Sequence, residues 1–170
     1  MIEVNKKLLV IAVAVAMLAL PISAVSATKP ITLTLTGTFT VFPDPQGADM
    51  KIIEAGESGV TLWKIRGLEV VWSGDITGSG HYDANWLIEP GSMLADKSVG
   101  THFLEDATIY DVDTDYNVGT GDLAIGHNHD GFDYTIKSGS EDFRSIRGKG
   151  TSTPVSMIEY TYEIVIQINP

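Results

Sequence analysis

Residues 31–41 read ITLTLTGTFTV, and this stretch decides the fold class. Every even position is threonine, and every odd position except Gly37 is apolar. Successive side chains of a β-strand point to opposite faces, so this alternation predicts a long strand with one buried face. Residues 158–168, IEYTYEIVIQI, alternate in the same way near the other end of the chain. We therefore expect a long strand at each end of the domain.

The intervening sequence has the composition of further strands separated by turns. Strands are expected at residues 60–66, 68–76, 81–88, 102–110, 116–125, 131–137 and, more weakly, 143–146. The glycine-rich stretches 78–80, 119–121 and 148–150 are typical of turns, and residues 48–57 and 91–97 are each expected to form at most a short turn. No helical period occurs after residue 27. The pattern predicts a single all-β domain, an antiparallel β-barrel of about eight strands, with a β-sandwich or jelly roll as the alternative.

Composition excludes several classes of function. The chain has 170 residues, with 22 acidic against 11 basic side chains and no cysteine. The absence of cysteine excludes disulfides, thiolate metal sites and cysteine nucleophiles. A net charge of −11 argues against a nucleic-acid partner, because binding phosphates requires clustered lysine and arginine.

The N-terminus has the pattern of an export signal. Lys6 and Lys7 precede an apolar run over residues 8–20, which is followed by Pro21 and the small residues of 23–27. This order predicts a secretory signal peptide over residues 1–27, a mature barrel domain over 28–170 and an extracellular or cell-surface location. A retained anchor is the alternative, but thirteen helical residues span less than about 20 Å, which is too short for a hydrocarbon core of about 30 Å. No membrane span is expected once the signal has been removed.

Three short segments carry a resemblance to a known family. They are Gly37-Thr38-Phe39-Thr40-Val41, the run over residues 71–80, and the spacing of Gly139, Phe143, Ile146, Gly148 and Gly150. In this order the segments resemble the small barrels related to allene oxide cyclase and dirigent proteins, including uncharacterised secreted members. The resemblance implies an eight-stranded antiparallel barrel with a central, largely apolar pocket. It assigns no catalytic residue, and residues 90–130 depart from the pattern.

A histidine pair is the sharpest candidate for chemistry. His127 and His129, two residues apart on a strand, would project to the same side, and Asp133 follows four residues later. Such a set suits a divalent transition metal, and the spacing is similar to the first motif of cupins, with aspartate in place of glutamate. The second cupin motif is missing, so a fourth ligand would have to be His81 or His102. The alternative interpretation is a solvated Asn/Asp/Gly turn.

A group of carboxylates is the second candidate. Asp111, Asp113, Asp115 and Asp122 occupy positions 1, 3, 5 and 12 of a loop, a spacing that calcium favours. Tyr116 stands where a calcium loop needs glycine, so the alternative is a solvated acidic face. Ten aromatic residues form a third set and are expected mainly in the core, at positions 63, 72, 82, 86, 103, 132, 134, 143, 160 and 162.

Three hypotheses about function remain open. The first is an exported barrel without catalysis that binds a small apolar ligand or acts as a surface interaction module. The second is a metal-dependent, cupin-like oxygenase or isomerase that uses His127, His129 and Asp133. The third is a self-assembling surface protein whose first or last strand pairs with another subunit.

Overall fold

The computed structural model forms nine antiparallel strands in one sheet that closes on itself. It describes residues 29–42, 48–54, 56–92, 97–128, 132–156 and 158–169. The strands are β1 (Ile31–Phe42), β2 (Asp49–Glu54), β3 (Thr61–Gly74), β4 (Ile76–Ile88), β5 (Lys97–Asp111), β6 (Tyr116–His127), β7 (Asp133–Gly139), β8 (Arg147–Pro154) and β9 (Glu159–Ile168). Two short 3₁₀ helices, η1 (Gly56–Ser58) and η2 (Glu141–Phe143), complete the elements.

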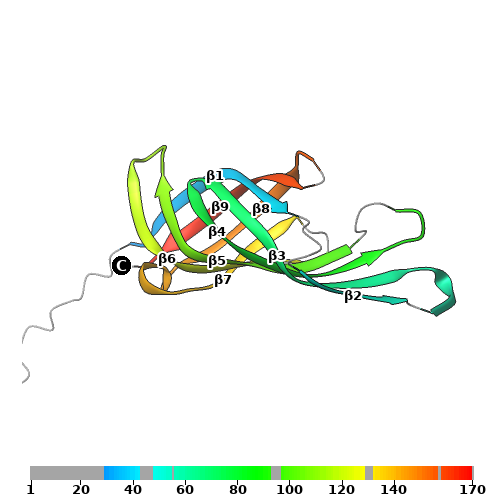
Figure 1. Cartoon of the computed structure of the whole chain (residues 1–170). Coiled ribbons are helices and arrows are strands. Elements are labelled where there is room, and N and C mark those ends of the chain that lie inside the picture. Colours follow the sequence, from blue (N-terminus) through cyan, green and yellow to red (C-terminus); the bar gives the residue numbers. More distant parts are fainter. Residues whose placement is uncertain are drawn as a thin grey trace, which may run out of the picture.

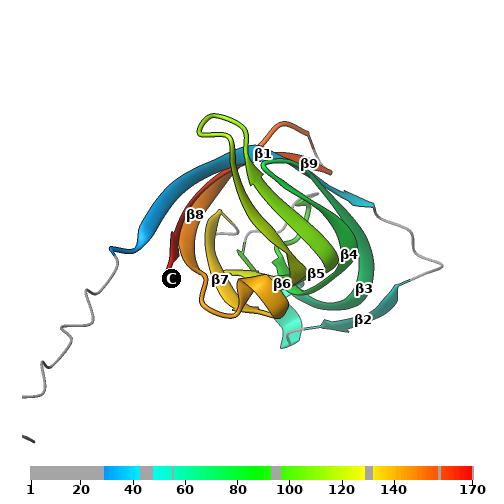
Figure 2. The same cartoon turned by 90° about the vertical axis from the view of Figure 1, so that its left-hand side faces the viewer.

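The barrel closes because β1 pairs on both sides. It lies beside β9 along most of its length and also pairs with β3, with Gly37 opposite Gly74 and Phe39 opposite Trp72. This second pairing joins the ends of the strand order and makes β1 and β3–β9 a closed eight-stranded barrel, seen end-on in Figure 2. The barrel prediction is confirmed, and the sandwich alternative is wrong. Among the described strands β2 pairs with β3 alone, and it extends beyond the barrel (Figure 1).

Both terminal strands form as expected. Leu33 lies opposite Ile166 and Leu35 opposite Ile164, so the apolar face of each strand supplies the barrel interior. β9 pairs with β1 and β8, whereas β1 pairs with β9 over residues 31–40 and with β3 only over residues 37–42. In the described ranges no strand pairs with the second edge of β1 over residues 31–36, so self-assembly through the first strand stays a prediction.

Several boundaries were wrong because glycines in the barrel wall resemble turn residues. Residues 60–66 and 68–76 belong mostly to one strand, β3, which has a bulge where the register shifts between Ile65 and Leu68. The glycine-rich stretches 78–80, 119–121 and 148–150 lie inside β4, β6 and β8. The tight turn falls instead at Gly74, where φ is +107° and an added Cβ would lie 2.6 Å from the Cα of Gly37. A side chain at this position would block the approach of β1 to β3.

Two other segments also differ from expectation. Residues 49–54 form a strand although their sequence, DMKIIE, has no clear alternation, because both faces of β2 are largely exposed. The expected weak strand at 143–146 is instead the end of η2 and the turn after it. Neither 3₁₀ helix, and no other helix in the described ranges, is long and apolar enough to cross a membrane. The expected signal peptide, residues 1–27, lies outside the described residues.

Candidate functional site

The interior of the barrel has two chemically different halves. Near η2 the inward side chains are mainly aliphatic, and η2 itself buries Phe143 and the following turn buries Ile146, at 0% and 1% exposure. Both side chains belong to the buried core, and Figure 2 shows η2 in front of the lower part of the ring of strands. Toward the opposite end the inward side chains are rings. We call this end of the interior the aromatic half, and it comprises Phe39, Trp72, Tyr82, His102, His127, Tyr134, Tyr160 and Tyr162.

Phe39 stands at the centre of the aromatic half. Its ring stacks on Trp72 at 4.8 Å and on Tyr160 at 4.9 Å, and His102 meets it edge-on. Sequence alternation places Phe39 inward on β1, and the pairings with β3 and β9 place its two stacking partners on the same face. The result is a packed aromatic wall in which each ring fixes the position of its neighbour.

His102 is fully buried and neutral. The Trp72 indole N–H donates to its Nδ1 at 3.1 Å, so Nδ1 is an acceptor and the ring proton of the neutral form lies on Nε2. Burial holds the pKa of His102 well below its usual value, and the neighbouring His127 lowers it further. The two imidazole centroids lie 6.1 Å apart. His102 thus presents a neutral N–H donor to the interior.

His127 belongs to a hydrogen-bonded chain with Tyr82. The Trp86 indole N–H donates to the Tyr82 oxygen at 3.3 Å, and that hydroxyl lies 2.7 Å from His127 Nε2. Burial lowers the pKa of His127 and raises the pKa of Tyr82 to about 12, so the hydroxyl donates and the neutral imidazole accepts. His127 Nδ1 then carries the proton and lies 3.3 Å from the carbonyl oxygen of Asn128. Both ring nitrogens of His127 are therefore engaged by the protein.

Ser152 provides a buried hydroxyl in the same half, and the residue is 5% exposed. No described group lies at full hydrogen-bonding geometry from its Oγ, but the Tyr134 hydroxyl is near enough that its interaction with Ser152 counteracts part of the rise that burial causes in the pKa of Tyr134. An unpaired buried hydroxyl is costly, so native proteins usually pair such groups with a protein atom, a water or a ligand.

Gly100 makes room for this arrangement. It pairs with His127 on one side and Ala84 on the other, and a Cβ there would lie 2.5 Å from the Tyr82 ring and 2.8 Å from His127 Nε2. The absence of a side chain lets the two rings approach each other across β5. Any larger residue would push apart the Tyr82–His127 hydrogen bond.

The aromatic half contains no buried charged side chain among the described residues. The two buried carboxylates, Asp75 and Asp111, lie at the β3–β4 and β5–β6 turns, and Asp75 is close enough to Tyr162 to help raise the pKa of its hydroxyl. Asp75 accepts hydrogen bonds from the backbone N–H groups of Thr36 and Val112, at 2.7 and 3.1 Å. The aromatic half therefore combines apolar ring surface with neutral donors and acceptors, which suits binding better than acid–base chemistry.

The structure separates the residues predicted to hold a transition metal. His127 points into the barrel, whereas Asp133 is exposed and precedes the inward-facing Tyr134, so the two lie on opposite sides of the wall. His81 stacks on Phe103 on the outer wall, and of the two proposed fourth ligands only His102 lies near His127. His129 lies outside the described residues, so the full set stays a prediction. Within the described ranges, no three His, Cys, Asp or Glu side chains are grouped to hold a metal ion.

The predicted calcium ligands are also spread out. The Asp111 carboxylate accepts from the backbone N–H groups of Asp113 and Thr114, at 3.0 and 3.2 Å, and so shapes the β5–β6 turn. Asp115 accepts a hydrogen bond from the Tyr110 hydroxyl. Asp122 lies further along β6, where it faces the backbone N–H of Asp106 at 3.4 Å. Calcium binding by these four residues stays a prediction.

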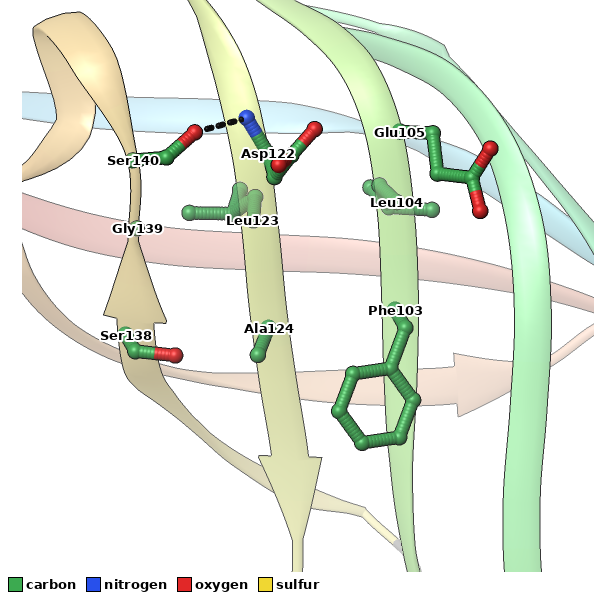
Figure 3. A pocket seen from close by; sticks show the side chains of 9 residues that line it. All are labelled: Phe103, Leu104, Glu105, Asp122, Leu123, Ala124, Ser138, Gly139 and Ser140. Carbon is green, nitrogen blue, oxygen red and sulfur yellow. Dashed lines mark hydrogen bonds between the residues drawn. The ribbon is translucent and has the colours of Figure 1, made fainter.

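A shallow groove lies on the outer wall over β5, β6 and β7. It encloses about 360 Å³, and Figure 3 shows Phe103, Ala124 and Ser138 along one row with Glu105, Asp122 and Ser140 along another. Phe103 is 37% exposed and Phe132 44%, so the expectation that these two rings belong to the core is wrong. The groove is shallow where β6 contributes only the small side chain of Ala124 between Phe103 and Ser138.

Sequence reasoning missed the residues that give the aromatic half its polarity. Tyr134 and Ser152 received no functional role, and His102 was considered only as an extra metal ligand. Tyr134 belongs to an alternating strand segment and could have been placed inward, but Gly148 and Gly150, which precede Ser152 in β8, obscured its strand. Only the barrel register shows that these residues meet.

Comparison with known proteins agrees with this class of fold, an eight-stranded antiparallel β-barrel with an added strand. The sequence matches no protein-family model and no curated protein. Among solved structures it is similar to the crystal structure of a protein with unknown function from the DUF3224 family of Shewanella oneidensis MR-1. The two chains share 13% identity with a TM-score of 0.50, and the match covers 82% of this chain and 99% of the other. At this identity the likeness shows the fold alone.

Proposed function

We propose that this protein is a non-catalytic binding protein that holds a small, mainly apolar, uncharged ligand against the aromatic half of the barrel. The observation that carries the proposal is the buried hydroxyl of Ser152, which no described group meets at full hydrogen-bonding geometry and which lies beside the Tyr134 hydroxyl among neutral side chains. A ligand with one polar atom would satisfy this hydroxyl and lie against the surrounding rings.

The ligand is uncharged because the aromatic half offers no countercharge. His102 and His127 are neutral at pH 7, since burial lowers the pKa of each. A buried ion without a partner loses its hydration without compensation. The resemblance to allene oxide cyclase and dirigent barrels, which implies a central apolar pocket, supports the same type of ligand.

The proposal includes export. The pattern of residues 1–27 supports a cleaved signal peptide and an extracellular or cell-surface location. Intact-mass measurement of protein recovered outside the producing cells tests it, and the expected N-terminal residue is Thr28. Recovery of the uncleaved chain inside the cells would contradict this part of the proposal.

Titration with Nile red, a neutral lipophilic fluorophore, tests binding. We expect saturable binding at one site per chain, accompanied by a change in the fluorescence of Trp72 and Trp86, which contact the polar groups of this half. Competition by 4-methylphenol, a small neutral ring with one hydroxyl, should displace the dye. Loss of the Ser152 hydroxyl in Ser152→Ala should weaken 4-methylphenol binding about fivefold, the value of one neutral hydrogen bond of about 1 kcal/mol.

Ser138→Ala is the matched control. Ser138 lines the outer groove, so its substitution should leave the affinity unchanged. An effect at Ser138 without an effect at Ser152 would move the site to the outer wall and refute an interior ligand. Absence of saturable binding by Nile red and by 4-methylphenol would refute the proposed function.

A further inference from the structure

One strand stands outside the barrel with an unpaired edge. β2 pairs with residues 61–66 of β3, and no strand in the described ranges pairs with its other edge. Together with residues 61–66 of β3, 83–88 of β4 and 97–99 of β5 it forms a projecting sheet, which we call the arm (Figure 1). An unpaired strand edge presents backbone donors and acceptors to any strand that can lie beside it.

The arm is apolar on the face that continues the barrel interior. Directly opposite residues share a face, and the register runs from Ile52 to Trp63, Trp86 and Ser98 across the four strands. Trp86 belongs to the inner face because it donates to Tyr82. Ile52 is 51% exposed and Met50, two residues earlier on the same face, is 43% exposed. The ladder therefore ends at the free edge in exposed apolar side chains.

The outer face of the arm carries a second apolar row that also ends at this edge. Ile53, Leu62 and Leu87 lie opposite one another and are each partly exposed. Edge strands that remain monomeric are commonly protected by an inward charge, a proline or a bulge. β2 has no proline, and its register with β3 is regular. Its lysine, Lys51, lies on the outer face with Ile53, while the inner face carries Met50 and Ile52 up to Glu54 at the end of the strand.

We propose that β2 pairs with β2 of a second copy of this chain, in an antiparallel arrangement around a two-fold axis normal to the sheet. Such an axis keeps inner face beside inner face, so the apolar rows of the two arms become continuous. Centring the axis on Ile52 places Ile52 opposite Ile52 and joins the two Trp63–Trp86 ladders. Centring it on Lys51 would instead place two lysines opposite each other, which disfavours that register.

The association is expected to be weak and to depend on salt. In the register centred on Ile52, five residues of each strand pair and bury little surface, so the dissociation constant should lie in the micromolar range. Each chain carries a net charge of −11, and screening of this charge should therefore strengthen the dimer. The proposal does not depend on the ligand, because the free edge of β2 lies outside the closed barrel.

Sedimentation equilibrium of the purified protein tests the proposal. We expect the mass to rise toward twice that of the monomer between about 1 and 100 µM, and 0.5 M NaCl should shift this rise to lower concentration. Ile52→Lys should raise the dissociation constant at least tenfold. Val165→Lys is the matched control, because Val165 is similarly exposed, at 42%, on β9 in the barrel wall, and it should leave the dissociation constant unchanged. Near-UV circular dichroism checks that both variants keep the native packing of their rings.

Thiol cross-linking locates the interface. The chain has no cysteine, so Ile52→Cys introduces its only thiol. A short bismaleimide should couple Ile52→Cys into dimers, and Val165→Cys should remain monomeric. A monomer over the whole concentration range, or equal cross-linking at positions 52 and 165, would overturn the proposal.

Discussion

Lowering the pH from 7.5 to 5.5 should destabilise the barrel because it buries two histidines in their neutral form. Burial lowers the pKa of His102 and of His127, whereas in the unfolded chain each titrates near 6.5. Below pH 6.5 the unfolded state therefore binds more protons than the native state, and the free energy of unfolding falls as the pH falls. The stability from these groups is fully present above the unfolded pKa and is lost as the pH approaches the folded pKa.

The size of the effect follows from one proton per histidine. A group that stays neutral in the native state loses about 1.4 kcal/mol of stabilisation between pH 7.5 and 5.5. His102, whose pKa lies well below normal, should contribute this amount in full, and His127 should contribute up to the same amount. We expect a total loss of about 1.4 to 2.7 kcal/mol, a large share of a typical stability of about 5–15 kcal/mol.

Urea unfolding at the two pH values measures the effect. In His102→Gln, the difference in the free energy of unfolding between pH 7.5 and 5.5 should be smaller by about 1.4 kcal/mol, the contribution of one histidine. This holds even if the substitution also lowers the stability at pH 7.5. His81→Gln, which alters a ring stacked on the outer wall, is the control and should keep the wild-type dependence. Equal free energies of unfolding of the wild type at pH 7.5 and 5.5 would refute the reasoning that these histidines are buried and neutral.

Three further predictions concern single positions in the barrel. Phe143→Ala should lower the free energy of unfolding, measured in urea, by about 3–5 kcal/mol, because it leaves a cavity where a fully buried ring packs in the aliphatic half. A loss of less than about 1 kcal/mol would mean that this ring does not pack in the core. Gly100→Ala should cost about 1–3 kcal/mol and alter the Trp86 emission, because a Cβ at this position overlaps Tyr82 and His127; unchanged emission would contradict that packing. Asp75→Ala should lower the thermal midpoint, because it leaves the backbone N–H groups of Thr36 and Val112 unpaired at a cost of about 2–4 kcal/mol. Asp113 is exposed, so Asp113→Ala should change the midpoint little. Equal changes in the two variants would show that the hydrogen bonds of Asp75 do not stabilise the barrel.

The alternation of apolar and polar residues made the barrel predictable, and glycine limited the accuracy of its boundaries. Residues 31–41 and 158–168 form strands as expected, because a strand with one buried face imposes a period of two on its sequence. The same rule fails for β2, whose two faces are both largely exposed. It also fails at residues 78–80 and 148–150, where glycines that resemble turn residues lie in the wall because neighbouring strands leave no space for a side chain.

Composition and local period were enough to predict the fold class, the exclusion of thiol chemistry and the inward face of the regular strands. Only the tertiary structure decided which inward residues meet. The closing pair of β1 and β3 brings Phe39 onto Trp72, and the register of β5 with β6 and β7 brings His102, His127 and Tyr134 together. The same closure leaves β2 outside the barrel with a free edge. Strand register and closure are set by contacts between residues far apart in the chain, so no local pattern specifies them.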